Sequence, residues 1–363
     1  MAKRVGVDKW LFGTVLALVL FGLVMIFSTS AVIAKAQFGS PYRFVFNQML
    51  WVVLGVIALF VLLRVDYRWY NNPKVVFPSI AVTALLLISV FFMGGMNGAH
   101  RWVRIGGSTL QPSELAKPLV VLFLAYFLQN RIHQIDDWRH TLLRAIAVPL
   151  LFIGLILKEP DLGTALVCAG VTCLMLLLAG VRLRYIGLAI AAASPLMYYM
   201  LFHVAWRRAR MLAFMNPEAD PRGAGFHILQ SLIAVGTGGF HGLGLMEGRQ
   251  KLFYLPEPQT DFIYATVCEE LGILGALLLL AAFVFLGYRG LRAAFLSTDP
   301  FARFLAFGLT SAILIQAFFN ISVVLALLPT KGIPLPFISS GGTSVFITLA
   351  SMGVLLNITR EID

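Results

Sequence analysis

Long apolar runs separated by short polar segments dominate this sequence and limit what it can fold into. Of the 363 residues, 59% are hydrophobic and only 12% are charged, whereas soluble domains carry about 25% charged residues. A helix of about 20 apolar residues spans a bilayer and satisfies its own backbone hydrogen bonds there. The sequence therefore predicts an all-α polytopic membrane protein. We expect about ten spans, with these approximate bounds: 10–34, 46–64, 77–94, 112–130, 143–158, 163–180, 184–204, 262–288, 302–328 and 340–358.

The positive charges predict which side of the membrane each connection faces. An even number of spans places both termini on one side. If that side is the cytoplasm, the short inner connections carry most of the arginines and lysines, as cytoplasmic loops usually do. We therefore expect a multi-pass protein with both termini in the cytoplasm. The net charge of +11 then reflects topology and contact with anionic lipid headgroups, and it does not indicate nucleic-acid binding.

One external segment, about 205–261, is far longer than the other connections, so we expect a single membrane domain over 1–363 with one large extracytoplasmic loop. The loop opens with the basic stretch WRRARMLAF (206–214), which contains Arg207 and Arg210. Arg249 lies further along the same loop. A solvated surface is the simpler explanation for these cations. The helical spacing of the stretch and its position beside a span instead favour an anionic partner.

Charged residues within spans are costly and are usually functional. In TLQPSELAKPL (109–119), Glu114 and Lys117 are three residues apart and so share a helix face. They form either an ion pair that makes the span tolerable or the polar wall of a cavity. In the hairpin KEPDLGTA (158–165), Asp161 is predicted to cap the helix that follows.

The stretch LPEPQTDFIYATVCEELG (255–272) places three acids at the start of an apolar run. Asp261 lies at the outer mouth of the span, where it either caps the helix that begins near Phe262 or takes part in chemistry. Glu269 and Glu270 lie two turns deeper. Because adjacent helical residues point about 100° apart, we expect at most one of them to face the same cavity as Asp261. We assign at least one to packing of the span or to the cavity floor.

Prolines and glycines interrupt the apolar pattern in LLPTKGIPLPFISSGGTS (327–344), between the last two predicted spans. Irregular backbone at membrane depth is tolerated where it is buried in protein or lines a cavity. Lys331 and Ser339 are predicted to face such a cavity. The backbone N–H groups after the Gly341–Gly342 pair are placed to bind an anion at a helix start.

Other motifs exclude several kinds of site. Cys168, Cys173 and Cys268 lie in apolar runs without metal-ligand spacing, so we interpret them as buried hydrophobic residues. The glycine cluster 236–248 lacks the endings of phosphate-binding and dinucleotide-binding loops. The sequence requires no cofactor, although a divalent cation such as Mg²⁺ or Mn²⁺ is compatible with it.

Five segments together resemble the SEDS family of bacterial cell-envelope proteins, which includes FtsW, RodA and SpoVE. The resemblance covers nearly the whole chain, and the dipeptide before Gly332 is more similar to the FtsW and SpoVE branch. The segments are NGAHRWVRIG, LQPSELAK, EPDLGTA, GFHILQSLIAVGTGGFHGLGLMEGRQKLFYLPEPQTDFIYATVCEELG and LPTKGIPLPFISSGGTS.

The resemblance implies an enzyme of the bacterial cytoplasmic membrane that polymerises glycan strands from lipid II, an undecaprenyl-pyrophosphate-linked disaccharide peptide. The family's essential aspartate maps to Asp261, and its conserved acid and lysine map to Glu114 and Lys117. The resemblance also implies a role in cell division and two kinds of partner. One is a class B penicillin-binding protein, which cross-links the strands, and the others are further proteins of the division machinery.

From these assignments we expect Asp261 to act as the general base and a set of cations to bind the pyrophosphate. Two alternatives remain open. A lipid II flippase would need a polar path through the midplane, which Glu269 and Glu270 favour. A scaffold for the penicillin-binding protein would not need Asp261. The residues expected to contact the substrate are Arg101, Glu114, Lys117, Arg207, Arg210, Arg249, Lys331 and Ser339.

Overall fold

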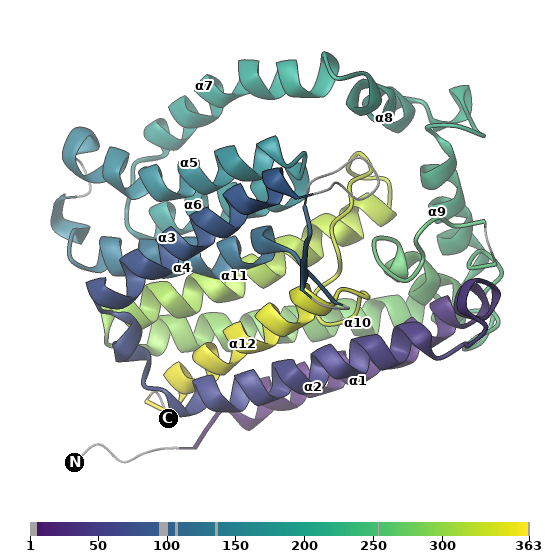
Figure 1. Ribbon diagram of the computed structural model, residues 1–363, viewed down its shortest axis with the longest axis horizontal. Coiled ribbons are helices and arrows are strands. Elements are labelled where there is room, and N and C mark those ends of the chain that lie inside the picture. The colour runs from purple at the N-terminus through teal and green to yellow at the C-terminus, as the bar shows by residue number, and fades with distance from the viewer. Residues whose placement is uncertain (1–5, 94–100, 106–107, 135–136, 253, 362–363) are drawn as a thin grey trace.

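The computed structural model describes residues 6–93, 101–105, 108–134, 137–252 and 254–361, and these are mostly helical (Figure 1). A short antiparallel hairpin of β1 (Val103–Ile105) and β2 (Ser108–Leu110) precedes the fourth helix. The helices are α1 (Lys9–Phe38), α2 (Arg43–Arg64), α3 (Pro73–Ser89), α4 (Pro112–Gln129), α5 (Leu143–Lys158), α6 (Leu162–Leu178), α7 (Leu183–Phe202), α8 (Ala205–Met215), α9 (Phe226–Thr237), α10 (Ile263–Leu296), α11 (Pro300–Val324) and α12 (Gly342–Thr359).

Each of the ten predicted spans coincides with one of these helices, which confirms the polytopic helical fold. Eight are long and apolar enough to cross a membrane, namely α1, α2, α3 with the turn after it, α5, α7, α10, α11 and α12. Of the other two, α6 has only 17 residues. Helix α4 begins at Pro112, as predicted, and carries Glu114 and Lys117 in its first two turns.

Helices α11 and α12 form the centre of the bundle. Helix α11 packs against α4, α6 and α10, and α12 packs along α2. By contrast, α7 has no buried residue and packs mainly on α8. Figure 1 shows α7 arching over α5 at the edge of the molecule. A span with so few packed neighbours exposes most of its surface to lipid, so α7 is the least restrained span of this bundle.

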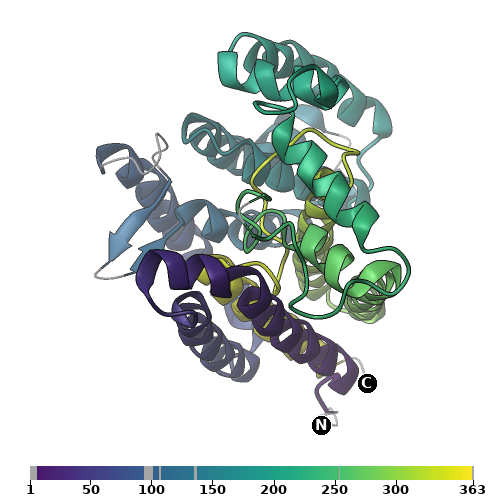
Figure 2. The same cartoon turned by 90° about the vertical axis from the view of Figure 1, so that its right-hand side faces the viewer.

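The predicted external segment contains two further helices. Helix α8 corresponds to the basic stretch, so the helical spacing expected there is confirmed, and α9 follows it. Figure 1 shows α9 crossing one end of the bundle, and Figure 2, viewed from that end, shows α8 and α9 in front of the spans. This segment therefore covers one mouth of the helix bundle.

The two ends of the described chain meet at the opposite end of the bundle. Asp8 caps α1 by accepting hydrogen bonds from the backbone N–H groups of Trp10 and Leu11. Its own backbone N–H donates to Thr359 Oγ1 at 3.3 Å, and its carboxylate pairs with Arg289 at 2.6 Å. The start of α1 and the end of α12 therefore lie on the same side of the membrane, as the even number of spans predicted.

Helix α10 is interrupted at Gly272, which has φ 65° and ψ −165°. A side-chain carbon at Gly272 would lie 2.4 Å from the Gly242 nitrogen, so only glycine fits there. The loop after α9 inserts at this break. Leu243 N–H donates to the Glu269 carbonyl, and Ile273 N–H donates to the Gly239 carbonyl, each at 3.0 Å. The interruption therefore ties the external loop into the first two turns of α10.

Candidate active site

Asp261 lies in the turn that leads into α10, at the covered mouth of the bundle. Helix α10 starts after Phe262 and has no side-chain cap, so the capping alternative for Asp261 is wrong. Among the described residues, its carboxylate accepts no hydrogen bond. Only its backbone carbonyl is bound, by the Asn320 side-chain amide at 2.8 Å. The carboxylate is therefore free to accept a proton or a hydrogen bond from a ligand.

The surroundings of Asp261 make its carboxylate an effective base near neutral pH. Burial and the neighbouring charge of Glu257 raise the pKa of Asp261 to about 7. Arg210 and Arg101 act in the opposite direction. Because the desolvation of the carboxylate outweighs the nearby cations, the proton affinity of this group is well above that of an ordinary aspartate. A base with a pKa near the working pH is the most effective proton acceptor in catalysis.

A cavity with cationic walls adjoins Asp261. A side-chain carbon at Gly332 would lie 2.9 Å from Asp261 Oδ2, so the cavity wall at Gly332 touches the carboxylate. Four separate segments form the lining: residue 101, the α5–α6 hairpin, α7–α8 and the loop after α11. The lining residues are Arg101, Pro160, Asp161, Leu162, Gly163, Leu201, Trp206, Arg207, Arg210, Met211, Pro329, Thr330, Lys331 and Gly332.

The four cations of this cavity lack carboxylate ion-pair partners within the described part of the chain. Burial and the charge of Arg101 lower the pKa of Arg207, and burial lowers that of Arg210. Burial and the charge of Arg207 lower the pKa of Lys331 to about 8. Cations that are desolvated and repel one another gain most from a shared anion. The cavity therefore suits a multiply charged anion such as a pyrophosphate.

Local contacts hold the arginines in place. Arg207 and Arg210 are three residues apart on α8, and their guanidinium groups lie 5.0 Å and 5.1 Å from the centre of the Trp206 ring. Arg101 donates from Nε to the Glu159 carbonyl at 3.0 Å and also donates to the Pro160 carbonyl. Contacts that lock a cation in its rotamer reduce the entropy lost when an anion binds.

Asp161 also lines the cavity, but its carboxylate already accepts hydrogen bonds from residues of α6 and from the start of α4. It caps α6, accepting from the Thr164 backbone N–H at 3.1 Å and from the Thr164 hydroxyl at 2.9 Å. Gln111 and Ser113 also donate to it. The sequence-based prediction that Asp161 is a helix cap is confirmed. Its contacts join the start of α4 to the start of α6.

Glu114 and Lys117 form a buried ion pair that lies outside the cavity lining. Lys117 Nζ is 2.8 Å from Glu114 Oε2 and 2.5 Å from Gln316 Oε1. Gln316 in turn donates to the Pro334 carbonyl at 2.8 Å. The pair thus supports the α11–α12 loop (residues 325–341), which carries Lys331. The pair therefore contacts this loop indirectly, through Gln316.

Two other residues expected at the substrate also lie outside the lining. Arg249 is exposed. In the described structure its side chain makes no hydrogen bond or ion pair, and its backbone N–H donates to Glu269 at 2.8 Å. Ser339 is buried, accepts from the Leu335 N–H at 2.8 Å and donates to the Thr260 carbonyl. Ser339 is therefore placed to hold the backbone beside Asp261.

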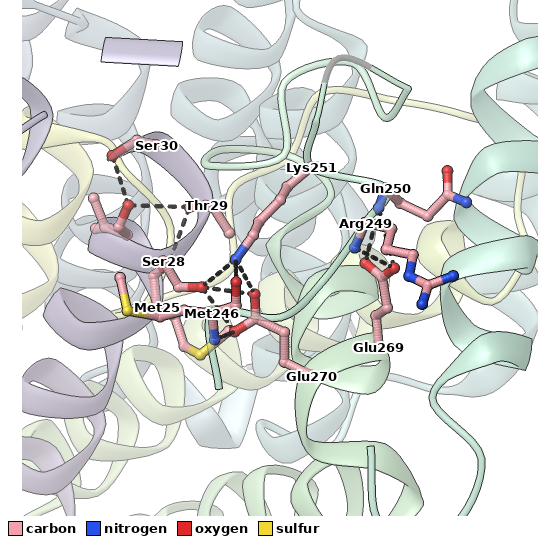
Figure 3. Close-up of polar contacts among 11 residues, drawn as sticks. Met25, Ser28, Thr29, Ser30, Met246, Arg249, Gln250, Lys251, Glu269 and Glu270 are labelled. Atoms are coloured by element: carbon pink, nitrogen blue, oxygen red, sulfur yellow. Dashed lines mark hydrogen bonds and ion pairs between the residues drawn. The ribbon is translucent and has the colours of Figure 1, made fainter. Parts of the chain in front are cut away.

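Glu269 and Glu270 bind the loop after α9, as Figure 3 shows, and neither of them lines the cavity. Glu269 accepts from the backbone N–H groups of Arg249 and Gln250 at 2.8 Å and 3.0 Å. Glu270 pairs with Lys251 at 2.6 Å and accepts from the Ser28 hydroxyl. At most one was expected to face the same cavity as Asp261, and neither lines it. The sequence did not predict the pairing of Glu270 with Lys251, because Lys251 lies in an irregular loop 19 residues before Glu270.

The donor set around the cavity does not form a metal cage. Within the part of the chain that the structure describes, no three His, Cys, Asp or Glu side chains gather in a metal-binding group. Magnesium and manganese prefer several oxygen ligands, whereas this cavity is lined by four cations, with the carboxylate of Asp261 beside them.

Comparison with known proteins identifies the family. The family model described as "Cell cycle protein", which covers FtsW, RodA and SpoVE, matches residues 8–363. The chain belongs to this family. The match extends over all twelve helices, so it includes the loop of Asp261 and each cation of the cavity.

Relatives of the FtsW/RodA/SpoVE family match over nearly the full length. The chain is 43% identical to a probable peptidoglycan glycosyltransferase FtsW of Geobacter metallireducens, with 95% of this chain and 92% of the relative covered. It is 40% identical to the stage V sporulation protein E of Bacillus subtilis, with 99% and 98% covered. These matches place the chain in the FtsW branch, in agreement with the motif-based prediction.

Solved structures of the family share the fold. A chain from a peptidoglycan synthase complex that coordinates polymerization and crosslinking has a TM-score of 0.79 at 26% identity, with 98% of this chain and 99% of that chain covered. RodA of Thermus thermophilus has a TM-score of 0.72 at 25% identity, with 98% and 97% covered. The helical arrangement described above is therefore that of the FtsW/RodA/SpoVE family.

Proposed function

We propose that this protein is a peptidoglycan glycosyltransferase that polymerises lipid II into glycan strands on the outer face of the cytoplasmic membrane during cell division. One observation carries the proposal. Within the described structure, the carboxylate of Asp261, whose pKa is raised to about 7, has no hydrogen-bond partner and adjoins a cavity whose four cations have no carboxylate partner. A base beside an anion-binding cavity is what glycosyl transfer with a pyrophosphate leaving group requires.

In the proposed reaction, Asp261 accepts the proton of the acceptor sugar's 4-hydroxyl. The hydroxyl oxygen attacks the anomeric carbon of the donor, and a β-1,4 glycosidic bond forms as the bond to the pyrophosphate oxygen breaks. The leaving undecaprenyl pyrophosphate keeps that electron pair. General-base catalysis of this kind contributes about 10²–10⁴-fold.

The cavity cations stabilise the charge that develops on the leaving group. Arg207 and Arg210 suit phosphate oxygens because a planar guanidinium donates two parallel hydrogen bonds, while Lys331 and Arg101 complete the cationic wall. Glu114 and Lys117 act indirectly, through Gln316 and the α11–α12 loop. Because the cavity residues do not fit a metal cage, no step is assigned to Mg²⁺ or Mn²⁺.

The prenyl chain of the substrate needs an apolar route from the cavity to the bilayer. Leu201, near the end of α7, lines the cavity, and α7 has no buried residue. We place the prenyl chain along this helix. Because α7 packs on few neighbours, a prenyl chain that lies along it displaces few contacts between helices.

The proposed orientation places α8, α9 and the cavity outside the cell and both termini in the cytoplasm. The distribution of arginines and lysines supports this orientation. A class B penicillin-binding protein and other division proteins are the proposed partners. The similarity to a chain of a synthase complex that coordinates polymerization and crosslinking supports the first of these.

A lipid II flippase is the alternative. Its main support in the sequence was Glu269 and Glu270, but their carboxylates bind Lys251, Ser28 and backbone N–H groups of the external loop. They are therefore not available to line a transport path. The cations of the cavity instead gather at the mouth that α8 covers.

The test is polymerisation of fluorescent lipid II by the purified protein with its penicillin-binding partner. We expect Asp261→Asn to lose at least 100-fold in rate and to remain folded. Glu247→Gln, which neutralises an exposed acid of the same external segment, is the matched control and should polymerise normally. Near wild-type rates for Asp261→Asn would refute the base assignment. Transport of lipid II across vesicles without polymerisation by the wild type would establish the flippase instead.

A further inference from the structure

The backbone just before α10 lacks the hydrogen bonds that a helix supplies. Intrahelical bonds begin at the carbonyl of Phe262, which accepts from the Ala265 N–H at 3.0 Å. The carbonyls of Gln259, Thr260 and Asp261 precede that point and need partners elsewhere, because an unpaired buried carbonyl is costly. These partners determine where the Asp261 carboxylate lies.

All three carbonyls are bound by one neighbouring region, the end of α11 and the loop after it. The Ser340 N–H donates to the Gln259 carbonyl at 2.8 Å. The Ser339 hydroxyl donates to the Thr260 carbonyl. The Asn320 side-chain amide donates to the Asp261 carbonyl at 2.8 Å. Three consecutive carbonyls are thus attached to a segment about 60 to 80 residues further along the chain.

Asn320 makes a second bond with the same nitrogen. Its Nδ2 also donates to the Ile333 carbonyl at 2.7 Å. Ile333 follows Gly332, whose backbone lies against the Asp261 carboxylate, and Lys331, which lines the cavity. An amide nitrogen carries two hydrogens. Here one hydrogen is donated to the segment before α10 and the other to the loop after α11. Asn320 therefore bridges the base segment and the cation segment.

The position of Asn320 makes this bridge rigid. The residue is 1% exposed and lies on α11, in the centre of the bundle. Gln316, one turn earlier on the same helix, donates to the Pro334 carbonyl at 2.8 Å. Both side chains thus present amides to one edge of the loop from a packed helix, which is a more precise support than another loop would be.

We propose that Asn320 is a positioning residue for glycosyl transfer, which sets the separation between the Asp261 carboxylate and the Lys331–Gly332 wall of the cavity. This inference rests on the proposed function of the site. Asn320 touches no reacting atom and acts only through the two carbonyls that it holds. A displacement of about 1 Å at a reacting group can lower a rate by about 100-fold, so loss of the bridge should lower kcat more than it changes KM.

Two substitutions separate the bridge from simple packing. Asn320→Leu keeps the volume and removes both donors. Asn320→Asp keeps the shape, and when its buried carboxyl is protonated it has one O–H donor, so it can satisfy only one carbonyl. Asn357→Leu is the matched control. Asn357 is also a buried amide that bridges backbone groups, donating to the Leu63 carbonyl and accepting from the Tyr67 N–H, but it lies near the opposite end of the bundle.

The experiment measures lipid II polymerisation by folded wild type, Asn320→Leu, Asn320→Asp, Asn357→Leu and Asp261→Asn. It also measures amide hydrogen exchange in residues 256–264 and 332–340. We expect kcat to fall about 30- to 100-fold for Asn320→Leu and less for Asn320→Asp, with KM within about threefold. Exchange should accelerate in both segments for Asn320→Leu, and in one of the two segments for Asn320→Asp. Asn357→Leu should lower thermal stability and keep kcat per folded molecule.

The outcomes are distinguishable. Absence of polymerisation by the wild type would refute the proposed function, whereas an active wild type with an active Asn320→Leu would refute the bridge. Equal losses of kcat in Asn320→Leu and Asn357→Leu would also refute it, because general destabilisation would then explain both. If Asn320→Leu does not fold, Asn320→Asp and Ser339→Ala decide the matter, and unchanged kcat and exchange in both would refute the proposal.

Discussion

Lys251 and Glu270 form an ion pair of 2.6 Å in which the side chains are 4% and 0% exposed. Lys251 comes from the external loop and Glu270 from the second turn of α10, and Ser28 of α1 donates to the same carboxylate. The pair therefore fastens the loop to two spans beside the helix break at Gly272. Removing one member of a buried pair leaves an uncompensated charge, which costs about 3–5 kcal/mol.

We predict that Lys251→Met strongly lowers thermal stability in detergent, because Glu270 loses its counter-ion. The double variant Lys251→Met/Glu270→Gln should recover most of the loss, since a neutral glutamine can still accept from Ser28 and from the Met246 N–H. Melting temperatures and protease cleavage within 238–255 measure both effects. If the single and double variants melt together well below wild type, the charge explanation is wrong.

The proton affinity of Asp261 predicts an acid limb in the pH profile. A general base must be ionised, and the pKa of Asp261 is raised by burial to about 7. The value of kcat/KM should therefore fall about tenfold per unit as pH decreases below 7. Initial rates of lipid II polymerisation between pH 5.5 and 8.5 measure this limb. A profile that stays flat down to pH 5.5 would contradict the assignment.

The raised pKa of Asp261 also predicts how the stability of the fold depends on pH. Because the pKa of the Asp261 carboxyl is higher in the folded protein than in the unfolded chain, the folded state binds the proton more tightly, so stability falls as pH rises from about 4 to about 7. Asp261→Asn removes this loss. The variant should melt above wild type at pH 7.5, and the difference should shrink as pH falls toward 4. A lower melting temperature for Asp261→Asn at pH 7.5 would show that the carboxylate stabilises the fold.

Lys331 predicts an alkaline limb. Burial and the charge of Arg207 lower its pKa to about 8, so the free enzyme loses this cation as pH rises through 8. If Lys331 binds pyrophosphate, kcat/KM should decline above pH 8 in the wild type. Lys331→Arg, which keeps its charge, should abolish the decline, and Lys331→Met should raise KM at every pH. An unchanged alkaline limb in Lys331→Arg would exclude this role.

Gly332 provides a steric test of the site. A methyl group there would lie 2.9 Å from Asp261 Oδ2, so Gly332→Ala should displace the carboxylate or the loop and lower polymerisation by at least tenfold. Gly341→Ala is the control in the same loop, because its nearest neighbour would be 3.6 Å away. Polymerisation assays with matched amounts of folded protein compare the two. Equal activity of both variants would mean that the loop yields easily at Gly332.

Apolar periodicity and charge in the sequence predicted the spans, the position of the long segment between α7 and α10, and the meeting of the two termini at one end of the bundle. These features follow from local physics, because each span satisfies its own backbone and faces lipid. The cap at Asp161 and the start of α4 at Pro112 were predictable for the same reason. The roles of Asp261, Glu114 and Lys117 came from motif resemblance, since spacing alone left capping and ion pairing open.

Only the tertiary structure decided which charges share a site. Arg101, the α8 pair Arg207 and Arg210, and Lys331 come from three distant segments and converge on one cavity, whereas Arg249 does not. In the sequence, Glu269 and Glu270 resemble Asp261 as acids within an apolar run. In the structure, both carboxylates bind an irregular loop whose path no periodic pattern predicts. Asn320 stands in an apolar helix, and its importance appears only when its amide meets two carbonyls from separate segments. Local pattern determines elements, whereas contacts between distant segments determine which polar groups remain free for chemistry.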